Sequence, residues 1–227
     1  MSARFALRTA VSTLLLSFVV CTGCKAVPPP IVPTPKVDAE LAAKPGKATA
    51  IFAGGCFWGT QSVFQRVKGV VATTAGYAGG TSWTATYAQV TTETTGHAES
   101  VKVVYDPSKI TYGKLLQIFF SVHDPTTLNR QGPDRGTSYR SAIFYTNDEQ
   151  RKIASAYIAQ LEEAKVFPNK IVTEVTQSKG FYDAEDYHQD YATLNPNDPY
   201  IMVCDKPKIE TLKKEFPDLF VEYKSRR

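Results

Sequence analysis

The chain has 227 residues, of which 43% are apolar and 11% aromatic, and its formal net charge is +4. A chain of this composition can bury a hydrophobic core. Its charged residues form no basic stripe with interleaved aromatic residues, so the sequence gives no support to nucleic-acid binding.

The N-terminal residues have the pattern of an export signal. A basic start precedes the apolar run Ala10–Val20, which is shorter than the about 20 residues that span a membrane. The run ends in Cys-Thr-Gly-Cys, which resembles the lipobox of bacterial lipoproteins, although Cys21 stands where a leucine-like residue is usual. We therefore expect residues 1–23 to be a signal peptide and Cys24 to carry lipid, with secretion without lipid as the alternative.

The segment that follows the expected signal is rich in proline and alanine. Residues 24–47 show no sustained apolar period, and proline favours extended conformations. This pattern predicts a linker that holds residues 48–227, a single domain, away from a membrane surface. The protein is thus expected to be exported and anchored by lipid to a bacterial membrane, on its periplasmic or cell-surface side.

The first segment of the domain places a cysteine at a strand-to-helix turn. Residues 47–54 read as a strand, and apolar residues recur at helical spacing from Phe57 to Val67. Cys56 lies between them, after two glycines, where the N–H groups of a helix N-terminus favour the thiolate. The alternative is that Cys56 packs as a small buried hydrophobic residue.

The rest of the domain alternates between helices, strands and two long loops. The patterns predict, in chain order, a strand at 69–80, a polar loop, a strand at 98–108, a helix at 111–124, a second loop, a strand at 139–146, a helix at 148–167 with Asn147 as its N-cap, a strand at 170–177, and a short helix near the C-terminus. Some consecutive strands have no helix between them. We therefore expect an α+β fold with a mixed or antiparallel sheet and helices packed on it.

Five strings of residues carry a family resemblance. They are GGCFWG, the loop around Tyr87, GHAE at residues 96–99, QGPDRGTSYRS at 131–141 and AEDYHQDY at 184–191. Together and in this order they resemble the peptide methionine sulfoxide reductases of the A type, from about residue 50 to residue 199. The resemblance implies a ferredoxin-like core with extensions and long active-site loops.

The resemblance also implies the reaction and the site. The enzyme would reduce methionine S-sulfoxide, free or in peptides and proteins, and would use no metal or organic cofactor. Cys56 would attack the sulfoxide sulfur, and Glu99 would protonate the departing oxygen. The other implied site residues are Tyr87 and Tyr139 as hydrogen-bond donors to that oxygen, Phe57 and Trp58 around the substrate's methyl group, and Asp134 as an organiser of the site.

Physical chemistry supports these residue types independently. A sulfoxide oxygen is a poor leaving group unless it is protonated, so an acid must lie within hydrogen-bond reach. Desolvation raises the pKa of a buried glutamate and keeps it protonated, so Glu99 could serve. Tyrosine hydroxyls can stabilise the charge that develops on the oxygen.

Turnover leaves Cys56 as a sulfenic acid, which a thiol must reduce. Members of the family usually recruit a C-terminal cysteine in a glycine-rich tail and are then reduced by thioredoxin-like proteins. This chain has one cysteine in its tail, Cys204, in an apolar stretch that reads as a strand. Cys204 either resolves the sulfenic acid or is inert while an external thiol does so. The expected partners are oxidised proteins and a thioredoxin-like reductant, and the protein is expected to be a monomer.

Three other functions use the same residues. A cysteine hydrolase or acyltransferase would pair Cys56 with His97 or His188 as a base. A binding lipoprotein would use only the aromatic pocket. A zinc site would combine Cys56 and Cys204 with the two histidines, although no close ligand pair is present. An acid in the GHAE string favours reduction, because a hydrolase needs a histidine base instead.

Overall fold

The computed structural model describes residues 30–225, so the expected signal peptide and Cys24 lie outside the described residues. One six-stranded sheet organises the domain, with the strand order β7-β6-β1-β3-β2-β8. Its four central strands are β1 (Ala48–Gly54), β2 (Val70–Ala78), β3 (Ala98–Tyr105) and β6 (Ser141–Tyr145). These four strands pair in an antiparallel manner.

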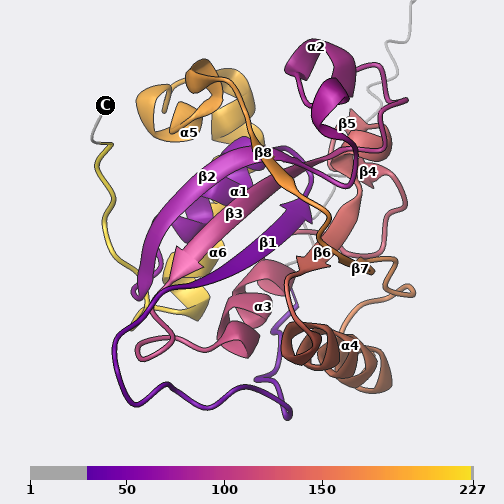
Figure 1. Cartoon of the computed structure of the whole chain (residues 1–227). Helices are drawn as coiled ribbons and strands as arrows, with labels where there is room; N and C mark the ends of the chain where they lie inside the picture. Colours follow the sequence, from indigo (N-terminus) through magenta and orange to yellow (C-terminus); the bar gives the residue numbers. More distant parts are fainter. Residues whose placement is uncertain (1–29, 226–227) are drawn as a thin grey trace, which may run out of the picture.

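Two helices complete a ferredoxin-like core. Helix α1 (Phe57–Phe64) connects β1 to β2, and α3 (Tyr112–Ser121) connects β3 to β6. The chain order is therefore strand, helix, strand, strand, helix, strand, with β1 and β3 at the centre of the sheet. Figure 1 shows α1 and α3 behind the sheet. The expected α+β, ferredoxin-like fold is confirmed.

The remaining elements extend this core. The edge strand β7 (Glu174–Gln177) pairs in parallel with β6 after α4 (Asp148–Glu163), and β8 (Phe181–Asp183) pairs with β2. The others are short, apart from the last: η1 (Ser82–Thr84), α2 (Tyr87–Val90), β4 (Arg130–Gln131), β5 (Asp134–Arg135), η2 (Thr137–Tyr139), η3 (Asp186–His188), α5 (Tyr191–Leu194), the π-helical turn η4 (Ile201–Asp205) and α6 (Lys206–Glu215).

The main core lies between the sheet and its helices. Phe52 of β1 stacks on Phe64 of α1 and on Phe119 of α3, with ring centroids 5.3 and 5.0 Å apart. All three rings are fully buried, and stacked aromatic pairs of this kind stabilise a core beyond the area they bury. The packing fixes both helices against β1. The N-terminus of α1 is thereby held at the end of that strand.

Residues 30–47 lie along the domain, which corrects part of the expected linker. Val32 is buried, and its carbonyl accepts a hydrogen bond of 2.8 Å from the Gln117 side chain. The Tyr157 hydroxyl donates to the Pro33 carbonyl at 2.6 Å. We call residues 30–47 the strap. Proline and alanine predicted extended chain, but local composition could not show that this chain has partners on two helices.

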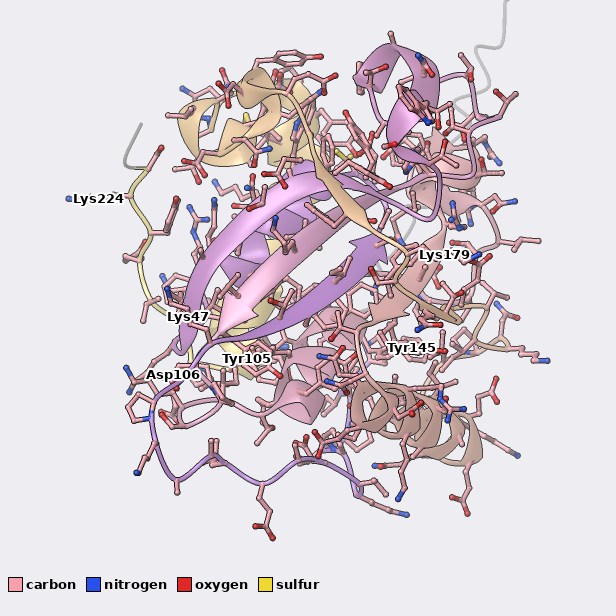
Figure 2. The ribbon with its side chains drawn as sticks, viewed as in Figure 1. Lys47, Tyr105, Asp106, Tyr145, Lys179 and Lys224 are labelled. Atoms are coloured by element: carbon pink, nitrogen blue, oxygen red, sulfur yellow. The ribbon has the colours of Figure 1, made fainter. Side chains whose placement is uncertain are left out.

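The far end of the strap is tied to the helix α3 and to the end of the sheet. Asp38 accepts hydrogen bonds from the Gly113 backbone N–H, at 2.7 Å, and from the Thr111 hydroxyl at the N-cap of α3. The Gly46 N–H donates to the Asp106 carboxylate at 3.1 Å. Lys47, beside Gly46, lies at the same end of the sheet as Asp106 (Figure 2). The strap is therefore part of the folded unit.

Candidate active site

The catalytic candidate Cys56 lies at the turn that the sequence predicts. Strand β1 ends at Gly54, Cys56 is the N-cap residue, and α1 begins at Phe57. Gly55 has a φ of +86°, and a Cβ atom there would lie 2.4 Å from the Gln131 side chain. Only glycine suits both the left-handed backbone and this close approach. The turn therefore places the Cys56 thiol at the start of the helix with little room around it.

The thiol of Cys56 has a raised pKa, not the lowered pKa that its helix position suggests. Burial is the main cause, and the nearby Glu99 and Asp205 carboxyls add to it. The Trp58 backbone N–H at the helix N-terminus acts in the opposite direction but is outweighed. Since Cys56 is only 7% exposed, desolvation dominates over the helix dipole. The helix N-terminus favours the thiolate as expected, but burial outweighs it, and the sulfur is held as a thiol.

Glu99 projects from β3 beside this thiol. It is 3% exposed, and its Oε2 accepts a hydrogen bond of 3.1 Å from the Phe57 backbone N–H. Burial raises the pKa of Glu99 to about 8, and the hydrogen bond from Phe57 offsets only part of that effect. Glu99 is thus mainly protonated at neutral pH. It has the protonation state that a general acid needs.

A cavity of about 170 Å³ brings the predicted residues together. It is lined by Cys56, Phe57, Trp58, Tyr87, Glu99, Asp134, Tyr139 and Tyr200. The first seven are the residues that the sequence assigned to the nucleophile, the acid, the oxygen donors, the methyl pocket and the organising aspartate. Burial raises the pKa of Tyr87 and of Tyr139, so both hydroxyls remain hydrogen-bond donors. The cavity offers a thiol, an acid and two phenols to one small ligand.

Tyr200 is the site residue that sequence reasoning missed. Its hydroxyl donates a short hydrogen bond to the Asp134 carboxylate, and its ring meets the Trp58 ring edge-on at 6.0 Å. Asp134 therefore holds a third tyrosine at the cavity. The only signal in the sequence is the Asn-Pro-Asn-Asp-Pro-Tyr string, a turn-rich stretch that precedes the C-terminal segment.

The loop that carries Tyr139 is fixed by another carboxylate that sequence reasoning missed. Glu93, with a φ of +63°, accepts hydrogen bonds of 2.7 Å from both the backbone N–H and the hydroxyl of Ser138. It also accepts a hydrogen bond of 3.0 Å from the Thr137 hydroxyl. These contacts join the two long loops and hold η2. They set the position of Tyr139 in the cavity.

Cys204 does not line this cavity. It lies in the π-helical turn η4, so the expectation of a strand around it is wrong. The turn leads directly into α6, and η4 packs against α1. Burial, with the charges of Asp205 and Asp134, raises the pKa of the partly exposed Cys204 thiol. Cys56 and Cys204 are both free thiols.

The two histidines of the hydrolase alternative serve other contacts. His97 accepts a hydrogen bond of 3.2 Å from the Gly80 N–H through Nδ1, and its Nε2 lies 2.9 Å from the Thr81 carbonyl. His188 accepts a hydrogen bond of 3.1 Å from the Trp58 indole. Neither ring has a hydrogen bond to Cys56 among the described residues. Within residues 30–225 there is also no cluster of three or more His, Cys, Asp or Glu that could hold a metal ion.

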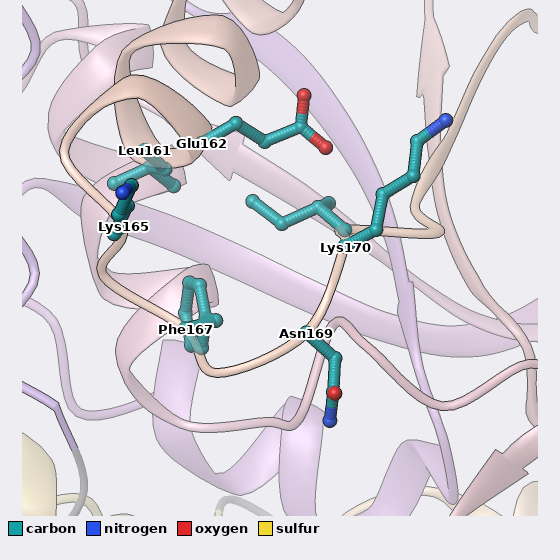
Figure 3. Close-up of a pocket in the computed structure, with 7 residues that line it drawn as sticks. Leu161, Glu162, Lys165, Phe167, Asn169 and Lys170 are labelled. Atoms are coloured by element: carbon teal, nitrogen blue, oxygen red, sulfur yellow. The ribbon is translucent and has the colours of Figure 1, made fainter.

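A larger hollow elsewhere is lined by no cysteine. This hollow, of about 330 Å³, lies between the end of α4 and the chain that follows, and it is lined by Leu161, Glu162, Lys165, Phe167, Asn169, Lys170 and Ile171 (Figure 3). It holds neither a cysteine nor a histidine. The smaller cavity at Cys56 instead joins a thiol to a buried carboxyl and two phenols, which makes it the candidate active site.

Comparison with known proteins decides the family. The model of the family described as peptide methionine sulfoxide reductase matches residues 48–219. This chain belongs to that family. Peptide methionine sulfoxide reductase MsrA 2 of Mesorhizobium japonicum is 59% identical over 181 residues, which are 79% of this chain and 93% of that protein. MsrA 2 of Synechocystis is 49% identical over 203 residues, which are 89% of this chain and 94% of that protein.

Solved structures agree with this assignment. Reduced Mxr1 of Saccharomyces cerevisiae matches with a TM-score of 0.62 and 36% identity, covering 72% of this chain and 92% of that one. Methionine sulfoxide reductase A of Corynebacterium diphtheriae matches with a TM-score of 0.59 and 36% identity, over 74% and 86% of the two chains. The predicted membership of a family of methionine sulfoxide reductases, and with it the enzyme class, is confirmed. No helix within residues 30–225 is both long and apolar enough to cross a membrane.

Proposed function

We propose that this chain reduces methionine S-sulfoxide, free or in peptides and proteins, with Cys56 as nucleophile and Glu99 as general acid. The observation that carries the proposal is the pairing of a buried thiol with a carboxyl whose pKa is about 8, in one cavity of about 170 Å³. Both groups are protonated at neutral pH. That pair suits a reaction that needs a proton at the leaving oxygen.

The chemical step follows from this arrangement. Glu99 donates its proton to the sulfoxide oxygen, while Tyr87 and Tyr139 donate hydrogen bonds to the same atom. The Cys56 sulfur attacks and supplies two electrons to the substrate sulfur, and the S–O bond breaks. The oxygen ends on Cys56 as a sulfenic acid, methionine leaves, and the thiol proton of Cys56 restores Glu99. The substrate sulfur is reduced and the cysteine sulfur is oxidised, so atoms and electrons balance.

The cavity walls support selection of one sulfoxide epimer. Phe57 and Trp58 form an apolar wall for the methyl group, and the hydroxyls of Tyr87 and Tyr139 with Glu99 form a donor set for the oxygen. A ligand that satisfies both walls presents its sulfur to Cys56 with one handedness. The family resemblance of the sequence implies the S epimer as the substrate.

Regeneration is assigned to external thiols of the thioredoxin class, with Cys204 as the resolving residue. The sulfenic acid of Cys56 condenses with a thiol, releases water and forms a disulfide, which a second thiol then reduces. Cys204 is the other cysteine of the described chain, and its turn packs against the helix that Cys56 caps. No organic cofactor or metal is required by this sequence of steps.

The proposed activity is tested with the two epimers separately. Purified protein is incubated with methionine S-sulfoxide or methionine R-sulfoxide, with dithiothreitol or thioredoxin as reductant, and methionine is measured. We expect turnover of the S epimer alone and none with Cys56→Ser, since a serine hydroxyl is a far weaker nucleophile. Turnover by Cys56→Ser, or equal use of both epimers, would contradict the proposal.

We also propose that Cys24 anchors the protein to a bacterial membrane by a lipid. The strap bears on the geometry of that anchor. Because residues 30–47 bind the domain, only residues 25–29 separate Cys24 from it, and six residue steps reach at most about 20 Å. The enzyme would then work close to the membrane surface instead of at the end of a long spacer.

Metabolic labelling with a fatty-acid analogue tests the anchor. We expect label on the wild-type protein and none on Cys24→Ala, which should move from the membrane fraction to the soluble fraction of the exported proteins. Equal labelling of both proteins, or labelling of neither, would leave a secreted enzyme without a lipid.

A further inference from the structure

The short segment from Glu185 to His188 contacts two walls of the active site at once. Strand β8 leads into it, and η3 follows with His188 as its last residue. His188 is 1% exposed, and its ring lies 4.6 Å from the ring of Tyr87, 4.9 Å from that of Phe57 and 5.8 Å from that of Trp58. The imidazole therefore sits behind three of the rings that line the cavity.

The hydrogen bond between Trp58 and His188 fixes the state of the imidazole. The Trp58 indole Nε1 lies 3.1 Å from His188 Nδ1. An indole nitrogen only donates, so Nδ1 must accept and the ring proton of neutral His188 must lie on Nε2. A doubly protonated ring could not accept this bond. Burial lowers the pKa of His188, which keeps the ring in this neutral form.

The opposite edge of the imidazole faces Glu185. His188 Nε2 is buried and has no hydrogen-bond partner within the described residues, and its nearest charged group is Glu185 Oε2 at 3.9 Å. That distance is too long for a hydrogen bond, but a carboxylate there favours a proton on the facing nitrogen. Glu185 therefore supports the tautomer that the indole requires.

Glu185 also contacts the wall of the cavity that Tyr87 contributes. Its Oε1 accepts a hydrogen bond of 2.9 Å from the Tyr87 backbone N–H, and its Oε2 accepts one of 2.8 Å from the Tyr77 hydroxyl. Burial raises the pKa of Glu185, but the hydrogen bonds from the backbone N–H groups of Tyr87 and Glu185 and from the Tyr77 hydroxyl more than offset it, so Glu185 is ionised. Tyr87 is the first residue of α2, a helix of one turn. The Glu185 carboxylate therefore binds the first backbone N–H of α2.

We propose that His188 and Glu185 are positioning residues of the reductase, His188 acting through Trp58 and Glu185 acting through Tyr87. The inference rests on the proposed function of the cavity, because it assigns Trp58 to the substrate's methyl group and Tyr87 to its oxygen. Neither positioning residue lines the cavity. Each is hydrogen-bonded to one residue that does, His188 to Trp58 and Glu185 to Tyr87.

The two residues have different kinetic consequences. The methyl group is present in the bound substrate and in the transition state. A displaced Trp58 therefore weakens the binding of both equally, which raises KM. Charge on the oxygen develops in the transition state, so a displaced Tyr87 lowers kcat. Loss of His188 therefore changes KM, and loss of Glu185 changes kcat.

The His188 arm of the test compares two substitutions. His188→Leu removes the acceptor and keeps an apolar side chain, and we expect KM for methionine S-sulfoxide to rise about 10-fold with little change in kcat. His188→Asn keeps an oxygen at the position of Nδ1 and should restore most of the wild-type KM. In a Trp58→Phe background, which lacks the indole donor, His188→Leu should change KM less than about 2-fold.

A spectroscopic readout reports the same contact without substrate. The chain has two tryptophans, and Trp83 is 88% exposed. In a Trp83→Phe background the single indole ¹⁵N–¹H signal should shift toward a solvent-exposed position in His188→Leu and stay in place in His188→Asn. His123→Leu is the matched control, since it removes a partly buried histidine whose partners are Phe119 and Ser141. It should lower stability and leave the indole signal unmoved.

The Glu185 arm uses a second double-mutant cycle. Glu185→Ala should lower kcat about 10-fold, and in a Tyr87→Phe background the same substitution should lower it less than about 2-fold. Full additivity in either cycle, or a loss of kcat without a change of KM in His188→Leu, would overturn the assignment of that residue. A wild-type protein that reduces neither epimer would refute the proposed function instead, whatever the indole signal shows.

Discussion

The backbone N–H of Phe57 donates a hydrogen bond of 3.1 Å to the carboxyl group of Glu99. Phe57 is the first residue of α1, and the preceding residue, Cys56, is the N-cap. One helix N-terminus therefore holds the acid and presents the nucleophile. This hydrogen bond links the turn that carries the nucleophile to the strand that carries the acid.

Replacing Glu99 by glutamine should remove the proton that the acid donates to the sulfoxide oxygen and keep the shape of the cavity. Glutamine retains an oxygen that can accept from the Phe57 N–H. We expect kcat to fall by about 100 to 10,000-fold, the range for a positioned proton donor. Alkylation of Cys56 by iodoacetamide should continue. Wild-type turnover by Glu99→Gln across neutral pH would show that another group supplies the proton.

The pKa of Glu99 also predicts the pH dependence of the wild-type enzyme. Burial raises this pKa to about 8, so the protonated acid is present below that value and is lost above it. We expect kcat/KM for methionine S-sulfoxide to decrease as pH rises through about 8. Glu99→Gln should lack this alkaline limb. A wild-type profile that is flat from pH 6 to pH 9.5 would contradict the assignment.

The same shift predicts that Glu99→Gln is more stable than the wild type in alkaline solution. Between pH 4.5 and about 8 the folded protein keeps a proton on Glu99 that the unfolded chain has lost, so stability falls as pH rises through this window. At about 1.4 kcal/mol for each pH unit, the upper bound of the loss is about 5 kcal/mol. Glutamine does not ionise, so the Glu99→Gln variant avoids this loss of stability. Urea denaturation at pH 5 and pH 9 measures the free energy of unfolding of both proteins. An equal difference between Glu99→Gln and the wild type at both pH values would show that the raised pKa of Glu99 is not its cause.

Local sequence patterns predicted the parts of the site that depend on neighbouring residues. The Gly-Gly-Cys turn and the helix after it are properties of a short segment, and the structure places α1 at Phe57 as expected. The family resemblance supplied the distant members of the cavity. Tyr200, Glu185 and Glu93 were missed because their roles depend on contacts with segments far away in the chain.

The pKa of Cys56 and the packing of the strap show more clearly what local sequence patterns cannot predict. The position of Cys56 at a helix N-terminus favours the thiolate, but burial and two neighbouring carboxyls decide its pKa. Composition predicted extended chain for residues 30–47, yet the surface against which that chain lies is built by α3 and α4. Burial and partners are tertiary properties, so neither result could be read from the segment itself.

The strap should contribute measurable stability through Asp38. This carboxylate accepts hydrogen bonds from the Gly113 N–H and the Thr111 hydroxyl at the start of α3. Asp38→Ala should lower the free energy of unfolding by about 1 kcal/mol, as the loss of a helix cap does. Glu40→Ala, at an exposed position of the same strap, is the control and should change it little. Equal midpoints in urea for Asp38→Ala and wild type would show that the contact adds nothing.

The final prediction concerns Cys204, whose behaviour decides how the enzyme is recycled. One turnover without reductant should leave neither Cys56 nor Cys204 alkylatable, and mass spectrometry should show a bond between them. A disulfide needs the two Cα atoms within about 7 Å, and π-helical turns such as η4 are irregular and often functional, so η4 is the segment we expect to rearrange. Cys204→Ser should still reduce one equivalent of substrate but lose more steady-state turnover with thioredoxin than with dithiothreitol, because the small thiol can reach the Cys56 sulfenic acid directly. A sulfenic acid that persists in the wild type, trapped by dimedone while Cys204 remains alkylatable, would instead make this an enzyme with one redox-active cysteine.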